Sequence, residues 1–167
     1  MNIEVFDYFD VKKRASELDC NQPTSLALLP ENLATARSRQ ELVYRQSTST
    51  VRELWSRVGI VETDIQREGD TFQEIQVKGG EWIGPIIFVG AAAISQNASL
   101  ISIALGVVSN YLTDLFKGNL NQKQMTLDIV VEQTKGKTYK RLHFEGSVRD
   151  FKNTELAEHV RRIQQDN

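Results

Sequence analysis

The hydrophobic pattern of this chain is dominated by one long stretch without a charged residue, residues 82–113. The stretch reads WIGPIIFVGAAAISQNASLISIALGVVSNYLT, and the polar residues 95–99 divide it into two apolar halves. A membrane-spanning helix needs about 20 predominantly apolar residues, and neither half is that long. A helix through both halves would place Gln96 and Asn97 near the bilayer centre, where unpaired amides are costly. The pattern therefore favours a buried helical hairpin, or a kinked helix followed by a straight one, over a membrane span.

Small residues recur at every fourth position in the second half of this stretch, at Ala98, Ser102 and Gly106. A helix would align them as a ridge, which allows another backbone to approach closely. The neighbouring positions are apolar nearly all round the helix, as is typical of helices that are buried on most sides. The ridge therefore predicts close packing, either against the rest of this chain or against a second subunit.

Alternation of apolar and polar residues predicts a β-hairpin on each side of the uncharged stretch. The first hairpin would span residues 60–77 and turn at Gly69-Asp70. The second would span residues 125–144, with Leu127 and Ile129 on its inner face and a turn at residues 135–137. Both strand pairs would have one face that is available to pack against the apolar helices.

Helix signals lie toward the two ends of the chain. Capping boxes begin at Ser38 and Thr50, and the second one opens a helix over residues 50–58 that ends at Gly59. Residues 153–164 have the periodicity of an amphipathic helix. We therefore expect an α+β protein in which two β-hairpins pack against a central apolar helical hairpin, with short capped helices in the N-terminal third. Residues 1–49 would form an N-terminal appendage with short helices, and residues 50–167 the main domain, with the uncharged helical segment at 82–117.

Composition agrees with a folded globular protein. The chain has 167 residues, a hydrophobic fraction of 40% and a net charge of −2, which is too apolar for intrinsic disorder. Cys20 is the single cysteine, so an internal disulfide framework is excluded and a reducing compartment is indicated. The first residues place acidic and aromatic side chains before basic ones, the reverse of a secretory signal. These features predict a cytoplasmic protein.

The sequence contains no set of residues at a catalytic or metal-binding spacing. His143 and His159 have no cysteine, histidine or carboxylate at ligand spacing, and Cys20 lacks the surroundings of a nucleophile motif. We therefore expect no catalytic residues, no metal and no cofactor, and the sequence favours a protein that is not an enzyme.

One strand of the second predicted hairpin carries a row of basic and aromatic side chains on a single face. The row, with its turn, consists of Lys135, Lys137, Tyr139, Arg141 and His143. Such a surface could contact phosphates or stack on bases. The alternative, which the negative net charge favours, is pairing across the hairpin with Asp128 and Glu132.

Residues 83–163 also have a recognisable order of segments. A small-residue-rich apolar segment ends in LTDLFKG, and the hairpin sequence TLDIVVEQTKGKTYKRLHFEG and a short amphipathic helix follow. In this order the region resembles the small effector-associated components found beside NTPase-centred bacterial conflict systems. The resemblance implies an adaptor or assembly module in a bacterial defence or stress pathway, without catalysis of its own, and it assigns no role to individual residues.

Three functions follow as hypotheses. The first is a non-enzymatic adaptor or self-assembling module, with a second copy or another protein as its partner. The second is a membrane-active, pore-forming effector that uses the uncharged hairpin at residues 82–113. The third is nucleic-acid or nucleotide binding through the basic strand face at residues 135–143.

Overall fold

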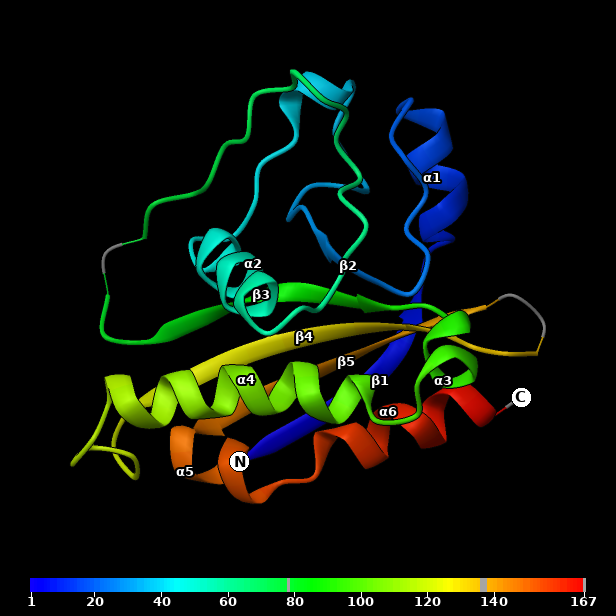
Figure 1. The fold of residues 1–167 in the computed structure, drawn as a ribbon. Coiled ribbons are helices and arrows are strands. Elements are labelled where there is room, and N and C mark those ends of the chain that lie inside the picture. Colours follow the sequence, from blue (N-terminus) through cyan, green and yellow to red (C-terminus); the bar gives the residue numbers. More distant parts are fainter. Residues whose placement is uncertain (78, 136–137, 167) are drawn as a thin grey trace.

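The computed structural model describes residues 1–77, 79–135 and 138–166, and their strands form one five-stranded mixed sheet (Figure 1). The strand order is β1-β5-β4-β3-β2. The strands are β1 (Asn2–Tyr8), β2 (Leu26–Leu29), β3 (Trp82–Val89), β4 (Gln124–Glu132) and β5 (Tyr139–Ser147). β3 and β4 are parallel, and the other neighbouring strands are antiparallel. The predicted α+β class is confirmed.

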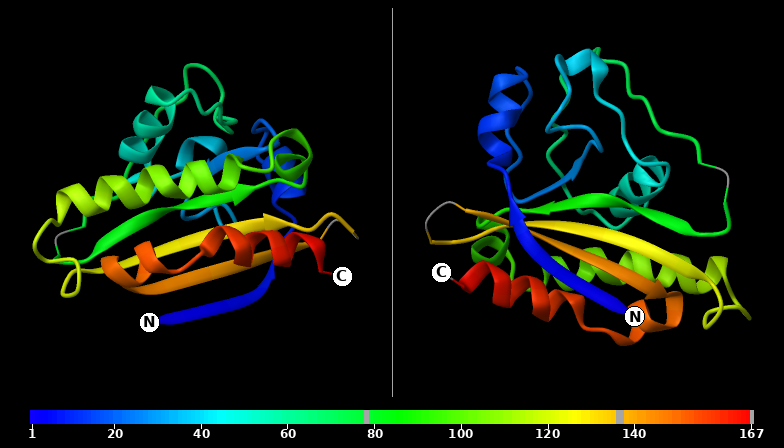
Figure 2. Two further views of the ribbon diagram at one scale, coloured as in Figure 1. Left: turned by 60° about the horizontal axis from the view of Figure 1, so that its bottom comes forward. Right: turned by 180° about the vertical axis from the view of Figure 1, so that it is seen from behind.

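Helices cover the two faces of the sheet unequally. The helices are α1 (Val11–Glu17), the 3₁₀ turn η1 (Arg39–Glu41), α2 (Thr48–Arg57), α3 (Ala92–Gln96), α4 (Leu100–Leu115), α5 (Val148–Asn153) and α6 (Leu156–Gln165). In Figure 1, α4, α5 and α6 lie below the sheet, while α1 stands above it. The views in Figure 2 show the same two layers on either side of the strands.

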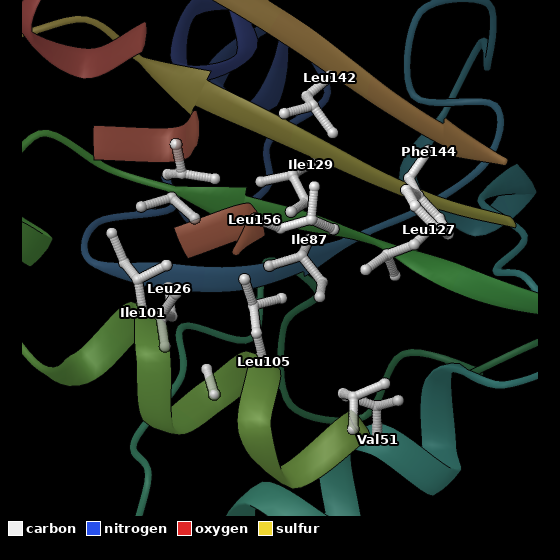
Figure 3. Packing of buried hydrophobic residues seen from close by; sticks show 14 of the residues in the cluster. Leu26, Val51, Ile87, Ile101, Leu105, Leu127, Ile129, Leu142, Phe144 and Leu156 are labelled. Atoms are coloured by element: carbon white, nitrogen blue, oxygen red, sulfur yellow. The ribbon is translucent and has the colours of Figure 1, made fainter. Parts of the chain in front are cut away.

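Two hydrophobic clusters fill the space between the sheet and its covering layers. The larger one lies between one face of the sheet and the helices α2, α4, α5 and α6, and Figure 3 shows Leu105 of α4 reaching toward Ile87. The smaller one lies on the opposite face, where Val11 and Ala15 of α1 pack with side chains that include Phe88. Successive residues of β3 therefore point into different clusters, and the strand is buried on both faces.

The expected helical hairpin over the uncharged stretch is wrong in its first half. Trp82–Val89 is the strand β3, hydrogen-bonded to β2 on one side and β4 on the other. A strand that is covered on both faces needs apolar residues at every position, so it lacks the alternation by which strands are recognised. The second half forms α4, as predicted. No helix of the described residues combines the length and the apolar character that crossing a bilayer requires.

The first predicted hairpin, residues 60–77, is also wrong. These residues make only isolated bridges, one from Thr63 to Ala27 and one from Glu74 to Tyr44. Gly69, with φ of 90°, does lie in a turn, but the segments on its two sides attach to other parts of the chain instead of to each other. The second predicted hairpin is confirmed, because β4 and β5 pair antiparallel with Leu127 opposite Phe144.

The helix predicted at residues 50–58 is confirmed, although it starts earlier than the capping box at Thr50 indicates. α2 begins at Thr48, and the hydroxyl of Ser47 donates to the carbonyl of Ile83 (2.6 Å) instead of capping the helix. Gly59 follows the helix with φ of 80°, as its predicted stop requires. At the C-terminal end, the helix predicted at residues 153–164 is confirmed as α6, and a short helix that was not predicted, α5, precedes it. Residues 1–49, expected as an appendage with short helices, contribute both edge strands of the sheet.

A close backbone contact fixes the end of β3. A Cβ atom added to Gly90 would lie 1.6 Å from the carbonyl oxygen of Thr24, so only glycine fits at this position. The amide of Gly90 donates to the carbonyl of Ser25 (2.8 Å), which ties the start of β2 to the end of β3. The chain turns from here into α3 and α4.

Candidate functional site

The predicted basic row lies partly on one face of β5, as the alternation of the strand requires. Arg141 and His143 are half-buried there, while Tyr139 on the same face is only 5% exposed. Lys135 lies beyond the end of β4 and is exposed, and Lys137 lies outside the described residues. The row is therefore not a continuous exposed surface over its described part.

The centre of this face is a buried carboxylate, Asp128 of β4, which is 1% exposed. Its Oδ1 accepts a hydrogen bond from Nε of Arg141 (3.0 Å) and lies 2.9 Å from Nδ1 of His143. Its Oδ2 accepts from Nη1 of Arg45 (2.6 Å). We call these four residues, Arg45, Asp128, Arg141 and His143, the Asp128 cluster. It links β4 and β5 to the irregular segment that precedes α2.

The charges of the Asp128 cluster are largely balanced from within. Burial alone would raise the pKa of Asp128, but the hydrogen bond from Arg141 and the charges of both arginines outweigh it, so the pKa lies below the usual value. Arg45 is also paired with Glu31. Arg141 lies over the rings of Phe6 and Tyr8 of β1, with its guanidinium carbon 6.0 Å and 5.4 Å from their centroids. These contacts leave little positive charge free for an external anion.

The cluster has one geometric element of acid–base chemistry. A carboxylate bonded to Nδ1 orients an imidazole and leaves Nε2 directed elsewhere, as in nucleophilic hydrolases. Nε2 of His143 lies 4.0 Å from Oε2 of Glu145. The arrangement therefore orients His143 toward another acidic side chain of the same strand.

A second buried carboxylate, Glu132, holds the other end of β4. Its oxygens accept hydrogen bonds from the amide of Ala91 (2.8 Å) and the hydroxyl of Tyr139 (3.2 Å), and Oε2 lies 3.0 Å from Nζ of Lys12. Burial raises the pKa of Tyr139, and the charge of Glu132 adds to the effect. The hydroxyl of Tyr139 therefore makes an internal hydrogen bond, and its buried ring is not exposed for stacking on a base.

Two residues of the predicted ridge, Ser102 and Gly106 of α4, line a groove between α4 and the helices α5 and α6, whereas Ala98 lies in the turn before α4 and is not part of the helix. The groove has a cavity volume of about 360 Å³. The guanidinium of Arg161 crosses it and donates to the carbonyl of Ala98 (2.9 Å) and the hydroxyl of Ser102 (2.8 Å). Gly106 faces open space, since a Cβ atom added to it would meet no atom of the rest of the chain within 4 Å. At Gly106, the ridge therefore packs against no other backbone of the described residues.

A second groove, with a volume of about 410 Å³, lies between the end of α2 and the start of α4. Three large apolar side chains on its walls are open to solvent: Val58 is 55% exposed, Val61 85% and Ile103 45%. The sequence does not indicate this surface, because its alternation places Val61 in a hairpin that does not form.

Metal-ligating and nucleophilic side chains are otherwise dispersed over the structure. The described residues contain no group of three or more histidine, cysteine, aspartate or glutamate side chains placed to hold a metal ion. Cys20 is buried, which raises the pKa of its thiol and keeps the fraction of reactive thiolate low.

Neither a protein family, nor a curated protein, nor a solved structure matches this chain.

Proposed function

We propose that the protein is a non-enzymatic module that assembles with copies of itself. The charged and the apolar side chains of the protein differ in how far their contacts are satisfied within the chain. The buried carboxylates Asp128 and Glu132 engage the cations around them, whereas several large apolar side chains remain open to solvent. The exposed groups that concern us are Val5, Phe6, Val58, Val61 and Ile103. Exposed apolar side chains are typical of protein-binding sites, and here they form two separate groups, one on the edge strand β1 and one in the groove between α2 and α4.

The nucleic-acid hypothesis has less support. Phosphate binding needs cations that can exchange their counterions for phosphate groups. Arg141 and His143 already contact Asp128, and the ring of Tyr139 is buried against Glu132. Binding at this face would have to break these internal contacts first.

The membrane-active hypothesis also has less support, because it assumes that residues 82–113 form a helical hairpin. The first part of this segment is β3, which pairs with two neighbouring strands within the sheet. Exposing it to a membrane would require both ladders to open. A place in a bacterial defence or stress pathway remains part of the proposal and rests on the resemblance of residues 83–163.

Native mass in solution tests the proposed function. Light scattering of the purified protein over a wide range of concentrations should show a species heavier than one chain. A mass of one chain at every concentration would contradict self-assembly. Vesicles of anionic lipid provide the comparison, since leakage on addition of the protein would support the membrane-active hypothesis instead.

A further inference from the structure

The two edges of the sheet differ in how their outer sides are covered. All four residues of β2 are buried, and the amide of Thr63 donates to the carbonyl of Leu26 (2.8 Å) on the outer side of that strand. At the other edge, five of the seven residues of β1 are exposed. Among the described residues, the backbone of β1 pairs only with β5, and Figure 2 shows the strand lying free at the margin of the sheet. A bare edge of this kind offers unpaired N–H and C=O groups to another strand.

The side chains of β1 favour pairing instead of preventing it. Val5 is 49% exposed on the face that carries Leu142, and Phe6 is 44% exposed on the face that carries Arg141. Natural edge strands are commonly protected by lysine, proline or a bulge. Residues 2–8 contain neither lysine nor proline, and their register with β5 is uninterrupted. Their only charged side chains are Glu4 and Asp7.

We propose that β1 pairs antiparallel with β1 of a second copy, about a two-fold axis at Val5, so that two sheets become one. This inference rests on the proposed function of self-assembly and names its surface. A two-fold axis perpendicular to the sheet keeps each face on its own side, so the ladder must be centred on a residue. The possible centres can then be compared by the side chains that they place opposite each other.

Centring on Val5 uses the whole strand and opposes no like charges. Val5 lies opposite Val5, Glu4 opposite Phe6, and Ile3 opposite Asp7. Centring on Glu4 or on Asp7 would place two carboxylates directly opposite each other, which is destabilising. Centring on Phe6 avoids that conflict but shortens the ladder. The sequence of β1 is thus self-complementary in one full-length register.

A charge-pair experiment tests this interface. Val5→Lys places two ammonium groups opposite each other, and Val5→Glu places two carboxylates there, so each variant alone should associate about tenfold or more weakly than the natural protein. An equimolar mixture of the two variants should recover the dimer mass. Val77→Lys is the matched control, since Val77 is 46% exposed and lies outside β1 and outside both grooves, so its substitution should leave the mass unchanged.

Recovery in the mixture separates an interface effect from misfolding, because a misfolded variant would not regain partners. Phe6→Lys reports the register: it lies opposite Glu4 when the axis is at Val5, so this variant should remain dimeric. A Val5→Lys variant that keeps the dimer mass, or a mixture that stays monomeric, would overturn the β1 interface. The first of these results would be compatible with self-assembly, but through one of the two grooves instead of β1. A natural protein that is monomeric throughout contradicts self-assembly itself.

Discussion

Replacing Asp128 by asparagine should destabilise the fold more than any surface change of the same kind. The carboxylate is 1% exposed and is contacted by two guanidinium groups and an imidazole. Asparagine keeps the shape but has no charge, and its amide nitrogen would face donors of Arg45 or Arg141. The variant therefore leaves two arginines near a neutral group at the junction of the sheet and the segment before α2.

The size of the loss follows from the burial of the partners. Removing one member of a buried ion pair costs about 3–5 kcal/mol, because the remaining charge is left without compensation. The side chains of Arg45 and Arg141 are 13% and 19% exposed, so both can turn partly toward water. We therefore expect a loss near the lower end, about 3 kcal/mol. A folded domain usually has about 5–15 kcal/mol of stability, so the variant should still fold.

Urea denaturation at neutral pH measures this loss. The control is Glu53→Gln, which removes a carboxylate from an exposed pair with Arg57 on α2 and should cost less than about 1 kcal/mol. Asp128 has a lowered pKa, so its contribution is present above the unfolded value of about 3.9 and is lost as the pH falls through the lower folded value. The difference in free energy of unfolding between the natural protein and Asp128→Asn should become smaller only at acidic pH. A cost at neutral pH no larger than that of Glu53→Gln would refute this reasoning.

Two further predictions concern other parts of the fold. Gly90→Ala should lower the free energy of unfolding by about 1–3 kcal/mol or more, because the new methyl group meets the carbonyl of Thr24. Gly106→Ala places its methyl group in open space on α4 and should be neutral or stabilising by up to about 1 kcal/mol. Urea denaturation measures both, and equal effects would contradict the close contact at Gly90. Burial raises the pKa of Glu62, and its pair with Arg52 offsets this only in part. The natural protein should therefore gain stability relative to Glu62→Gln as the pH falls from 7 toward about 4.3, the pKa of glutamate in the unfolded chain. A stability difference between the two proteins that is constant with pH would contradict a carboxylate destabilised by burial.

Local periodicity is enough to predict the elements in which apolar and polar residues separate onto different faces. α2 and α4 have an apolar stripe or surface with a clear start and stop, and β4 and β5 alternate. β3 cannot be separated from a buried helix, because a short apolar run has the same appearance in both. Pro85 argues further against a central strand, but it lies where the register between β3 and β4 shifts, between Ile83 and Ile86.

The charged face was predictable only where its residues share a hairpin. Arg141 and His143 face Asp128 across β4 and β5, and the alternation of the two strands was sufficient to suggest that contact. Arg45 comes from an irregular segment and reaches Asp128 across 83 residues of sequence. Nothing in the local pattern around Arg45 indicates this partner, because its position depends on how the whole N-terminal third folds over the sheet.

The pairing of β1 with β5 has a consequence for how the chain folds during synthesis. Asn2 pairs with Glu145, so β1 leaves the ribosome long before its partner strand exists. At about 5–20 residues per second, that wait is on the order of ten seconds. The strand remains unpaired throughout this time, with its apolar side chains open to other nascent chains. Contacts this distant in sequence also slow folding, since a long loop must close before they form. The docking of β1 is therefore expected to be a late step of folding.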